Sequence, residues 1–127
     1  MSAYADAALA AARACGAKKM PDPVGAWRKA VLKIFPTRLS LQNKGCPRGA
    51  FLGLCASGLV VGVAAGDYTR SKLNREYAVR AVSLLRKEPS LAASQEALWI
   101  RARGAKRIAH NSQMDVVLAL WRAGLIS

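Results

Sequence analysis

The sequence carries one short pattern twice, and this repeat is the feature that most constrains the fold. FLGLCASGLV occupies residues 51–60 and VLALWRAGLI occupies residues 117–126, with the leucines and the second-half glycine at matching positions. Gly58 and Gly124 fall where a helix ends in a left-handed residue, a conformation that costs glycine little. The leucines around each glycine take the two positions that touch in a Schellman cap. We therefore predict two helices with the same cap, Gly-Leu followed by Val or Ile.

The first copy lies within residues 49–66, which carry no charged side chain. A stretch of that length is close to the roughly 20 residues that a transmembrane helix needs, and Gly58, Gly62 and Gly66 repeat at the spacing of packed membrane helices. The second copy argues against a membrane because it contains Arg122. We expect a buried helix with a glycine-rich turn after it, and no membrane partner.

Composition and helix-boundary signals extend this prediction to an all-α fold. Alanine, leucine and arginine dominate while aromatic residues make up only 6% of the chain, a mixture that favours helix over strand. Asp22 with Pro23 marks one helix start, and Pro36 and Pro89 mark two helix ends. We predict a compact single domain over residues 1–127, with five to six helices and short loops. The alanine-rich helix within residues 1–20 is expected at the periphery.

Cysteine usage and the N-terminal segment bound the cellular context. Cys15, Cys46 and Cys55 form no CxxC motif, which argues against a secreted disulfide scaffold. The N-terminal segment contains Asp6 and lacks the hydrophobic run of a signal peptide. We therefore expect a cytoplasmic protein. One histidine with scattered cysteines and carboxylates lacks metal-ligand spacing, so we predict no metal and no cofactor.

Cys46 is the first candidate for chemistry. Pro47 suits the first position of a helix, which would place Cys46 at the N-cap. The helix dipole, together with Lys44 and Arg48 nearby in sequence, would favour a reactive thiolate. The alternative is a buried, inert thiol, and this is what we predict for Cys55 in the middle of the helix.

His110 and Asn111 are the second candidate pair. With Cys46 they could form the Cys-His-Asn site of a thiol-dependent enzyme. The alternative is that both residues bond to loop backbone or cap the last helix. Ser112, with Asp115 three residues later, also resembles a capping box at the start of that helix.

The charge is strongly positive, with 20 basic and 7 acidic residues and a formal net charge of +13. Such a surface attracts nucleic acid or an acidic protein, although it can also serve solubility alone. The densest basic cluster is a candidate phosphate-binding loop, with a solvated loop as the alternative reading. It consists of Arg101, Arg103, Lys106 and Arg107. The basic face of the helix from about Asn74 to Lys87 could add contacts, but its connection to the preceding helix is too long for a helix-turn-helix.

Three blocks give the chain a family resemblance: KGCPRGAFLGLC, DYTRSKLNREYAVRAV and HNSQMDVVLALWRAGLI. In these blocks it resembles an uncharacterised bacterial family of small helical proteins, from about Ala26 to the end. The resemblance implies a soluble single domain and brings no activity with it. Some polar residues in the blocks are poorly explained by packing, and we predict that they form one polar ligand cleft. They are Cys46, Tyr68, Ser71, Asn74, His110, Asn111, Gln113 and Asp115.

Together these observations predict a protein whose function the sequence does not specify. We expect a small helical binding or adaptor protein with no catalysis of its own. Small helical domains often complete their core with a second copy, so we expect a homodimer. Two alternatives stay open: a nucleic-acid-binding protein that uses the basic loop and helix face, and a thiol-dependent enzyme at Cys46, His110 and Asn111.

Overall fold

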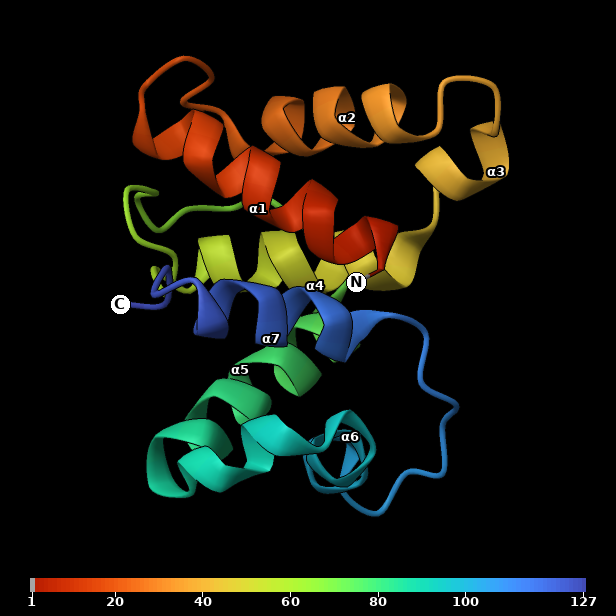
Figure 1. Ribbon diagram of the computed structural model, residues 1–127, viewed down its shortest axis with the longest axis vertical. Helices are drawn as coiled ribbons and strands as arrows, with labels where there is room; N and C mark the ends of the chain where they lie inside the picture. Colours follow the sequence, from red (N-terminus) through yellow and green to blue (C-terminus); the bar gives the residue numbers. More distant parts are fainter. Residues whose placement is uncertain (1) are drawn as a thin grey trace.

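The computed structural model describes residues 2–127 and stacks its helices in three tiers (Figure 1). Helices α1 and α2 lie at one end, α4 and α7 in the middle, and α5 and α6 at the other end. The elements are α1 (Ala3–Gly16), α2 (Pro23–Ile34), α3 (Leu39–Gln42), α4 (Gly45–Ala56), α5 (Lys72–Lys87), a 3-10 helix (Pro89–Ala93), α6 (Gln95–Arg103) and α7 (Gln113–Arg122). Six α-helices have nine residues or more, and residues 2–127 contain no strand. The predicted all-α domain is confirmed.

The repeated pattern forms the middle tier, where α4 and α7 run in the same direction (Figure 1). Gly58 has a φ of +73° and Gly124 a φ of +72°. In α4 the Leu59 N–H donates to the Leu54 carbonyl at 3.0 Å, and in α7 the Leu125 N–H donates to the Leu120 carbonyl at 2.9 Å. These are the long bonds of two Schellman caps, as predicted.

The two caps also pair with each other. Val60 and Ile126 form an isolated antiparallel bridge. The Val61 N–H donates to the Leu125 carbonyl at 2.8 Å, and the Ser127 N–H donates to the Leu59 carbonyl at 2.9 Å. The residues that leave each helix therefore satisfy each other's backbone groups and hold the C-terminal ends of α4 and α7 together.

Helix α1 is not peripheral, contrary to expectation. Its alanine face is buried, with Ala7 and Ala8 at 0% exposure and Ala11 at 1%. Small side chains allow neighbouring helices to approach closely, so α1 packs against both α2 and α7. Tyr4 stacks on Trp27 with 6.5 Å between ring centroids, and this contact joins α1 to the core.

Two glycines of α4 set its contact with α5. A Cβ atom at Gly53 would lie 2.7 Å from the Arg75 Cα, and one at Gly49 would lie 2.9 Å from the Asn74 Cβ. The helices can cross this closely only because both positions lack a side chain. The crossing fixes the start of α5 beside the start of α4.

Three predicted helix starts differ from the structure. α4 begins at Gly45, so Cys46 lies in the first turn and Lys44 is the N-cap residue. α5 begins at Lys72 with Ser71 as N-cap, ahead of the predicted Asn74. Ser112 precedes α7 but has a φ of +68° and makes no side-chain cap, so the predicted capping box is wrong. The sequence pattern marks these regions, while the exact first residue depends on tertiary contacts.

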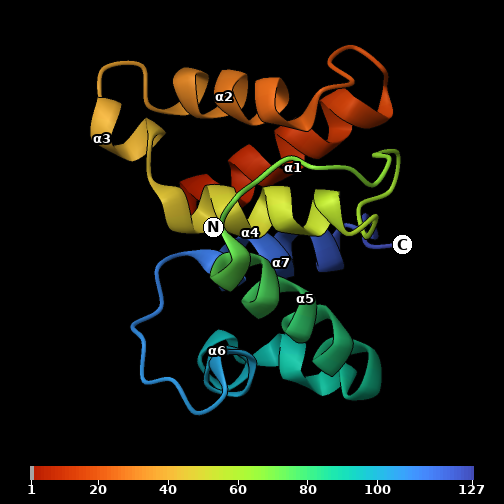
Figure 2. The same cartoon turned by 180° about the vertical axis from the view of Figure 1, so that it is seen from behind.

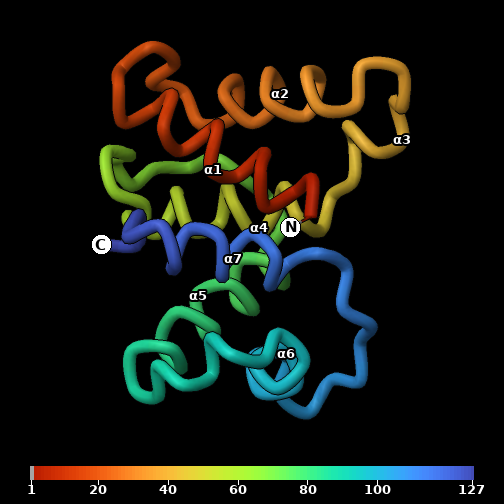
Figure 3. The backbone as a smooth tube through the Cα atoms, viewed as in Figure 1, coloured from red at the N-terminus to blue at the C-terminus, as the bar shows by residue number. Residues whose placement is uncertain are grey.

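The longest connections leave the body on opposite sides (Figure 3). Residues 57–71 join α4 to α5 and residues 104–112 join α6 to α7. Seen from behind, the first of these crosses the outside of α4 below α2 (Figure 2). Within residues 2–127, no helix combines the length and the apolar character that crossing a bilayer requires.

Candidate functional site

The starts of α4, α5 and α7 meet at one place in the fold. Cys46 of α4 and Asn74 of α5 line the same small pocket of about 400 Å³, together with Ser71. The Gln113 side chain of α7 donates from Nε2 to the Asn74 Oδ1 at 3.2 Å. The structure thus brings together the Cys46, Asn74 and Gln113 regions that the sequence separates widely. We call the pocket the Cys46 pocket.

Most of the predicted polar residues here are engaged in a chain of hydrogen bonds. Asn74 Nδ2 donates to the Ser71 Oγ at 2.9 Å, and the Gln113 Oε1 accepts from the Asn111 backbone N–H at 2.6 Å. Gln113 is 1% exposed, and it is the only polar side chain in the buried core of residues 2–127. These hydrogen bonds connect α7 to α5. The buried side chain among them, Gln113, therefore has a structural role.

His110 caps α7. Its Nε2 accepts a hydrogen bond from the Met114 N–H at 3.0 Å, and its ring packs edge-on against Trp99 with centroids 5.3 Å apart. Burial lowers the pKa of His110, Asp115 partly opposes this effect and Lys44 lowers the pKa further. A neutral ring is required because a protonated Nε2 cannot accept the bond. The sequence left two interpretations of His110 open, a catalytic residue or a helix cap. In the structure His110 caps α7.

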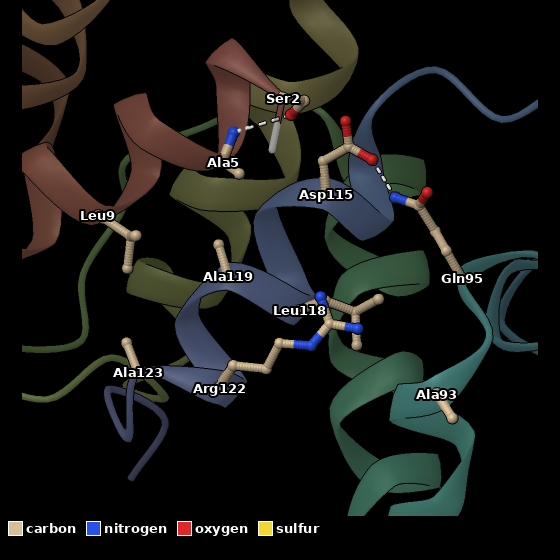
Figure 4. Close-up of a pocket in the computed structure, with 10 residues that line it drawn as sticks. All are labelled: Ser2, Ala5, Leu9, Ala93, Gln95, Asp115, Leu118, Ala119, Arg122 and Ala123. Carbon is tan, nitrogen blue, oxygen red and sulfur yellow. Dashed lines mark hydrogen bonds between the residues drawn. The ribbon is translucent and has the colours of Figure 1, made fainter.

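Of the eight predicted residues, Cys46, Ser71 and Asn74 line the Cys46 pocket. Tyr68 and Asp115 belong neither to this pocket nor to the hydrogen-bonded network beside it. The Tyr68 hydroxyl donates to the Ala64 carbonyl at 2.7 Å within the connection before α5. Asp115 accepts from the Gln95 side chain on the other side of α7. Figure 4 shows this pair at the edge of a separate hollow of about 550 Å³, where Arg122 also lies. The eight residues therefore do not share one cleft.

The arrangement offers little to a thiol-dependent enzyme. Cys46 is partly buried, and the only histidine uses Nε2 to hold the start of α7. Burial raises the pKa of Cys15 and, more strongly, that of Cys55, as expected for core thiols. Within residues 2–127 no three histidine, cysteine or carboxylate side chains gather as metal ligands would.

The predicted phosphate-binding loop is partly committed to the fold. Arg101 forms a salt bridge with Glu88 at 3.0 Å, and the Arg103 Nη1 donates to the Lys106 carbonyl at 3.0 Å. Lys106 and Arg107 are exposed in the connection before α7. The cluster presents positive charge, but two of its four members have partners within the chain.

Sequence reasoning missed a groove beside the Cys46 pocket, between α2, α4 and the connection before α5. Its volume is about 420 Å³, and its buried floor includes Trp27, Val31 and Leu52. Arg28, Arg48 and Arg70 line it, all three exposed, and no carboxylate lines it. We call it the arginine groove.

The arginine groove and the Cys46 pocket adjoin each other. Arg48, Thr69 and Arg70 line both. Trp27 lines the groove, and its indole Nε1 is a buried donor with no acceptor within residues 2–127. The chain does carry a signal for this site, because residues 23–66 contain six basic residues and no acidic one. This bias indicates an excess of positive charge in the segment, but only the fold shows which arginines line the same groove.

Comparison with known proteins gives a family but no activity. A family model described as "Family of unknown function (DUF6979)" matches residues 1–127. This extends the resemblance noted from sequence, which began at about Ala26, through α1 to the N-terminus. No curated protein and no solved structure matches the chain.

Proposed function

We propose that this chain, which belongs to the family of unknown function DUF6979, is a small binding protein that holds an anionic ligand in the arginine groove. One observation carries the proposal: Arg28, Arg48 and Arg70 surround a groove that no carboxylate lines. Guanidinium groups bind carboxylate and phosphate through paired, charge-assisted hydrogen bonds. A concave site of this size with an apolar floor is typical of ligand binding.

The charge balance supports an external anion. Residues 2–127 contain a single salt bridge, which joins Arg101 of α6 to Glu88 at the end of α5, and neither residue lines the groove. The groove arginines thus lack an acidic partner of their own. Because they are exposed, solvent and salt screen each of them, and no single arginine contributes much alone. Affinity would come from several of them converging on one ligand.

The proposal includes no catalytic step. A thiol-dependent reaction would need a base near Cys46, and the His110 Nε2 already accepts the Met114 N–H. The Ser71, Asn74 and Gln113 side chains bond one another. The groups that remain free to meet a ligand include the arginines and the Thr69 and Ser71 hydroxyl hydrogens.

The test titrates the ¹⁵N-labelled protein with inorganic phosphate, pyrophosphate and citrate at low ionic strength. Binding is monitored through the amide chemical shifts. We expect at least one probe to shift the amides of Cys46, Thr69 and Arg70. Arg48→Gln should weaken the effect, whereas Arg13→Gln, which removes the same charge from the exposed end of α1, should not. If none of the probes shifts these amides, the proposal is wrong.

A second candidate, nucleic-acid binding, is favoured by the outer face of α5. Lys72, Arg75 and Arg80 line a shallow hollow there of about 660 Å³. The Arg80 Nη1 donates to the Ala102 carbonyl at 2.7 Å, which brings this face next to the Arg101–Arg107 cluster. Phosphate contacts from such a face would be sequence-independent and salt-dependent.

Anisotropy of a labelled random 20-mer duplex across a salt series tests this candidate. Binding that weakens log-linearly with salt, and that Lys72→Gln and Arg107→Gln reduce while Arg48→Gln does not, would favour nucleic acid. Binding that depends on Arg48 instead, or absent binding at low salt, would exclude this face as the site.

The remaining partner predictions are proposals of the same kind. A homodimer or an acidic protein partner and a cytoplasmic location are what we expect from the sequence. Leu39 is the most exposed of the large apolar side chains, at 68%, and Leu32 on α2 is 52% exposed. Sedimentation velocity over a range of protein concentrations tests the homodimer, and a single monomeric species throughout would exclude it.

A further inference from the structure

The two parts of the site differ in chemistry. The Cys46 pocket is lined by the first turn of α4, by the residues just before α5, and by small polar side chains. The arginine groove has the apolar floor formed by Trp27, Val31 and Leu52. Arg48, Thr69 and Arg70 stand between the two parts and line both. A ligand that fills the whole site must therefore have a charged end and an apolar end.

We infer that the ligand is a phosphomonoester attached to a planar ring, as in a nucleotide, with its phosphate held by Arg48 and Arg70 where the arginine groove meets the Cys46 pocket, and with its ring on the floor of the arginine groove. This inference rests on the proposed function, since it names the class of anion that the groove would hold. It assigns the two parts of the site to the two parts of one molecule.

The Cys46 pocket suits a phosphate more than a carboxylate. Neither α4 nor α5 has a side-chain N-cap, so both present unsatisfied backbone N–H groups and the positive end of a helix dipole. Ser71 accepts from Asn74 and keeps its hydroxyl hydrogen free to donate. With Arg48 and Arg70 these donors approach from several directions, which a tetrahedral group with several oxygens can use and a planar carboxylate cannot.

The close crossing of α4 and α5 shapes this pocket. A Cβ atom at Gly49 would meet the Ser71 Oγ at 3.1 Å. Glycine at this position therefore lets the hydroxyl of Ser71 sit directly against α4. The starts of both helices can thus contact one small group between them.

The arginine groove suits a ring. Its apolar floor includes Trp27, Val31 and Leu52, and Trp27 stacks on Phe51 with 5.3 Å between ring centroids, so the base of the groove is held rigidly. Arg28 at the rim can stack on the exposed face of a bound ring.

Calorimetric titration with four probes tests the inference: AMP, phenyl phosphate, inorganic phosphate and adenosine. We expect AMP to bind at least about tenfold more tightly than inorganic phosphate and than adenosine, a difference of about 1.4 kcal/mol for each missing part. Phenyl phosphate should fall between AMP and inorganic phosphate. A 5′-phosphorylated trinucleotide, compared with its 5′-hydroxyl form, shows whether the phosphate belongs to a free nucleotide or to the end of an oligonucleotide.

Three surface variants locate the two parts of the ligand without endangering the fold. Arg70→Gln should weaken the binding of AMP and of inorganic phosphate alike. Arg28→Gln should weaken the binding of AMP and leave the affinity for inorganic phosphate unchanged. Arg13→Gln should change neither affinity. AMP affinity equal to that of inorganic phosphate would overturn the inference while leaving the proposed anion site standing. If no phosphate compound binds but citrate does, the inference also fails, and if no anion binds, both fail.

Discussion

At the scale of single residues, Gln113 carries two hydrogen bonds in a buried place. Its amide nitrogen donates to Asn74 and its amide oxygen accepts from the Asn111 backbone. We expect Gln113→Leu to lower the free energy of unfolding by about 2 kcal/mol, because both former partners are left unsatisfied. Urea denaturation measures the change. Asn111→Ala is the control, since alanine keeps the backbone N–H, and its effect should stay within about 0.5 kcal/mol.

His110 gives the fold a dependence on pH. Its pKa is lowered in the folded state by burial, so above the ordinary value of 6.5 it is neutral in both states and contributes no slope. As pH falls below that value the unfolded chain takes up a proton first, and stability decreases until the folded His110 titrates as well.

We therefore expect the urea midpoint of the wild type to fall between pH 7 and pH 5.5, a window above the ordinary range of carboxylates. His110→Gln cannot titrate but retains a hydrogen-bond acceptor. Its urea midpoint should therefore change less with pH over the same window. An equal slope in both proteins would show that His110 is not the source. Lys44 and Asp115 are the charged groups that act on His110, and both proteins retain them.

At the scale of helices, the contact between α4 and α5 depends on two glycines. We expect Gly53→Ala to cost about 1–3 kcal/mol, since the added Cβ would lie 2.7 Å from the Arg75 Cα and the helices must move apart. Gly16→Ala is the matched control: it lies at the end of α1 with nothing within 4 Å of the new atom. That change should be neutral or stabilising by up to about 1 kcal/mol. Thermal denaturation of both variants compares them, and equal costs would contradict the role of Gly53.

The helices also show what the sequence can and cannot predict. The caps at Gly58 and Gly124 were predictable because a Schellman cap is made by residues adjacent in sequence. The pairing of those caps with each other was not, since it joins residues 60 and 126. The capping of α7 was missed in part for the same reason. Ser112 fits a local rule, but the packing of His110 on Trp99 overrides it.

At the scale of the whole molecule, the candidate site shows the same limit. The polar residues near α4, α5 and α7 were identified from residue types, and the fold brings several of them together. The arginine groove was not identified, because its three arginines come from α2, α4 and the connection before α5. Only tertiary structure brings Arg28 to the same groove as Arg70. A deficit of acidic residues along the sequence predicts where positive charge accumulates, but it does not predict the shape of the surface that carries this charge.

The net charge of +13 leads to a prediction about anions. With one salt bridge in residues 2–127, added salt should stabilise the protein by screening repulsion. If Arg48 and Arg70 bind phosphate where the arginine groove meets the Cys46 pocket, sodium phosphate should stabilise the protein more than sodium chloride of equal ionic strength. At a phosphate concentration ten times the Kd, the extra stabilisation is about 1.4 kcal/mol.

Melting curves separate general screening from this specific binding. Phosphate is also a stabilising anion through its exclusion from protein surfaces, so the comparison must be made between variants. Arg48→Gln/Arg70→Gln and Arg13→Gln/Arg107→Gln remove equal charge, and both should respond equally to sodium chloride. Only the first double variant should lose the additional effect of phosphate, because of these four arginines only Arg48 and Arg70 line both parts of the site. An equal response of both doubles to phosphate would mean that the charge acts as a diffuse field and that the groove holds no anion.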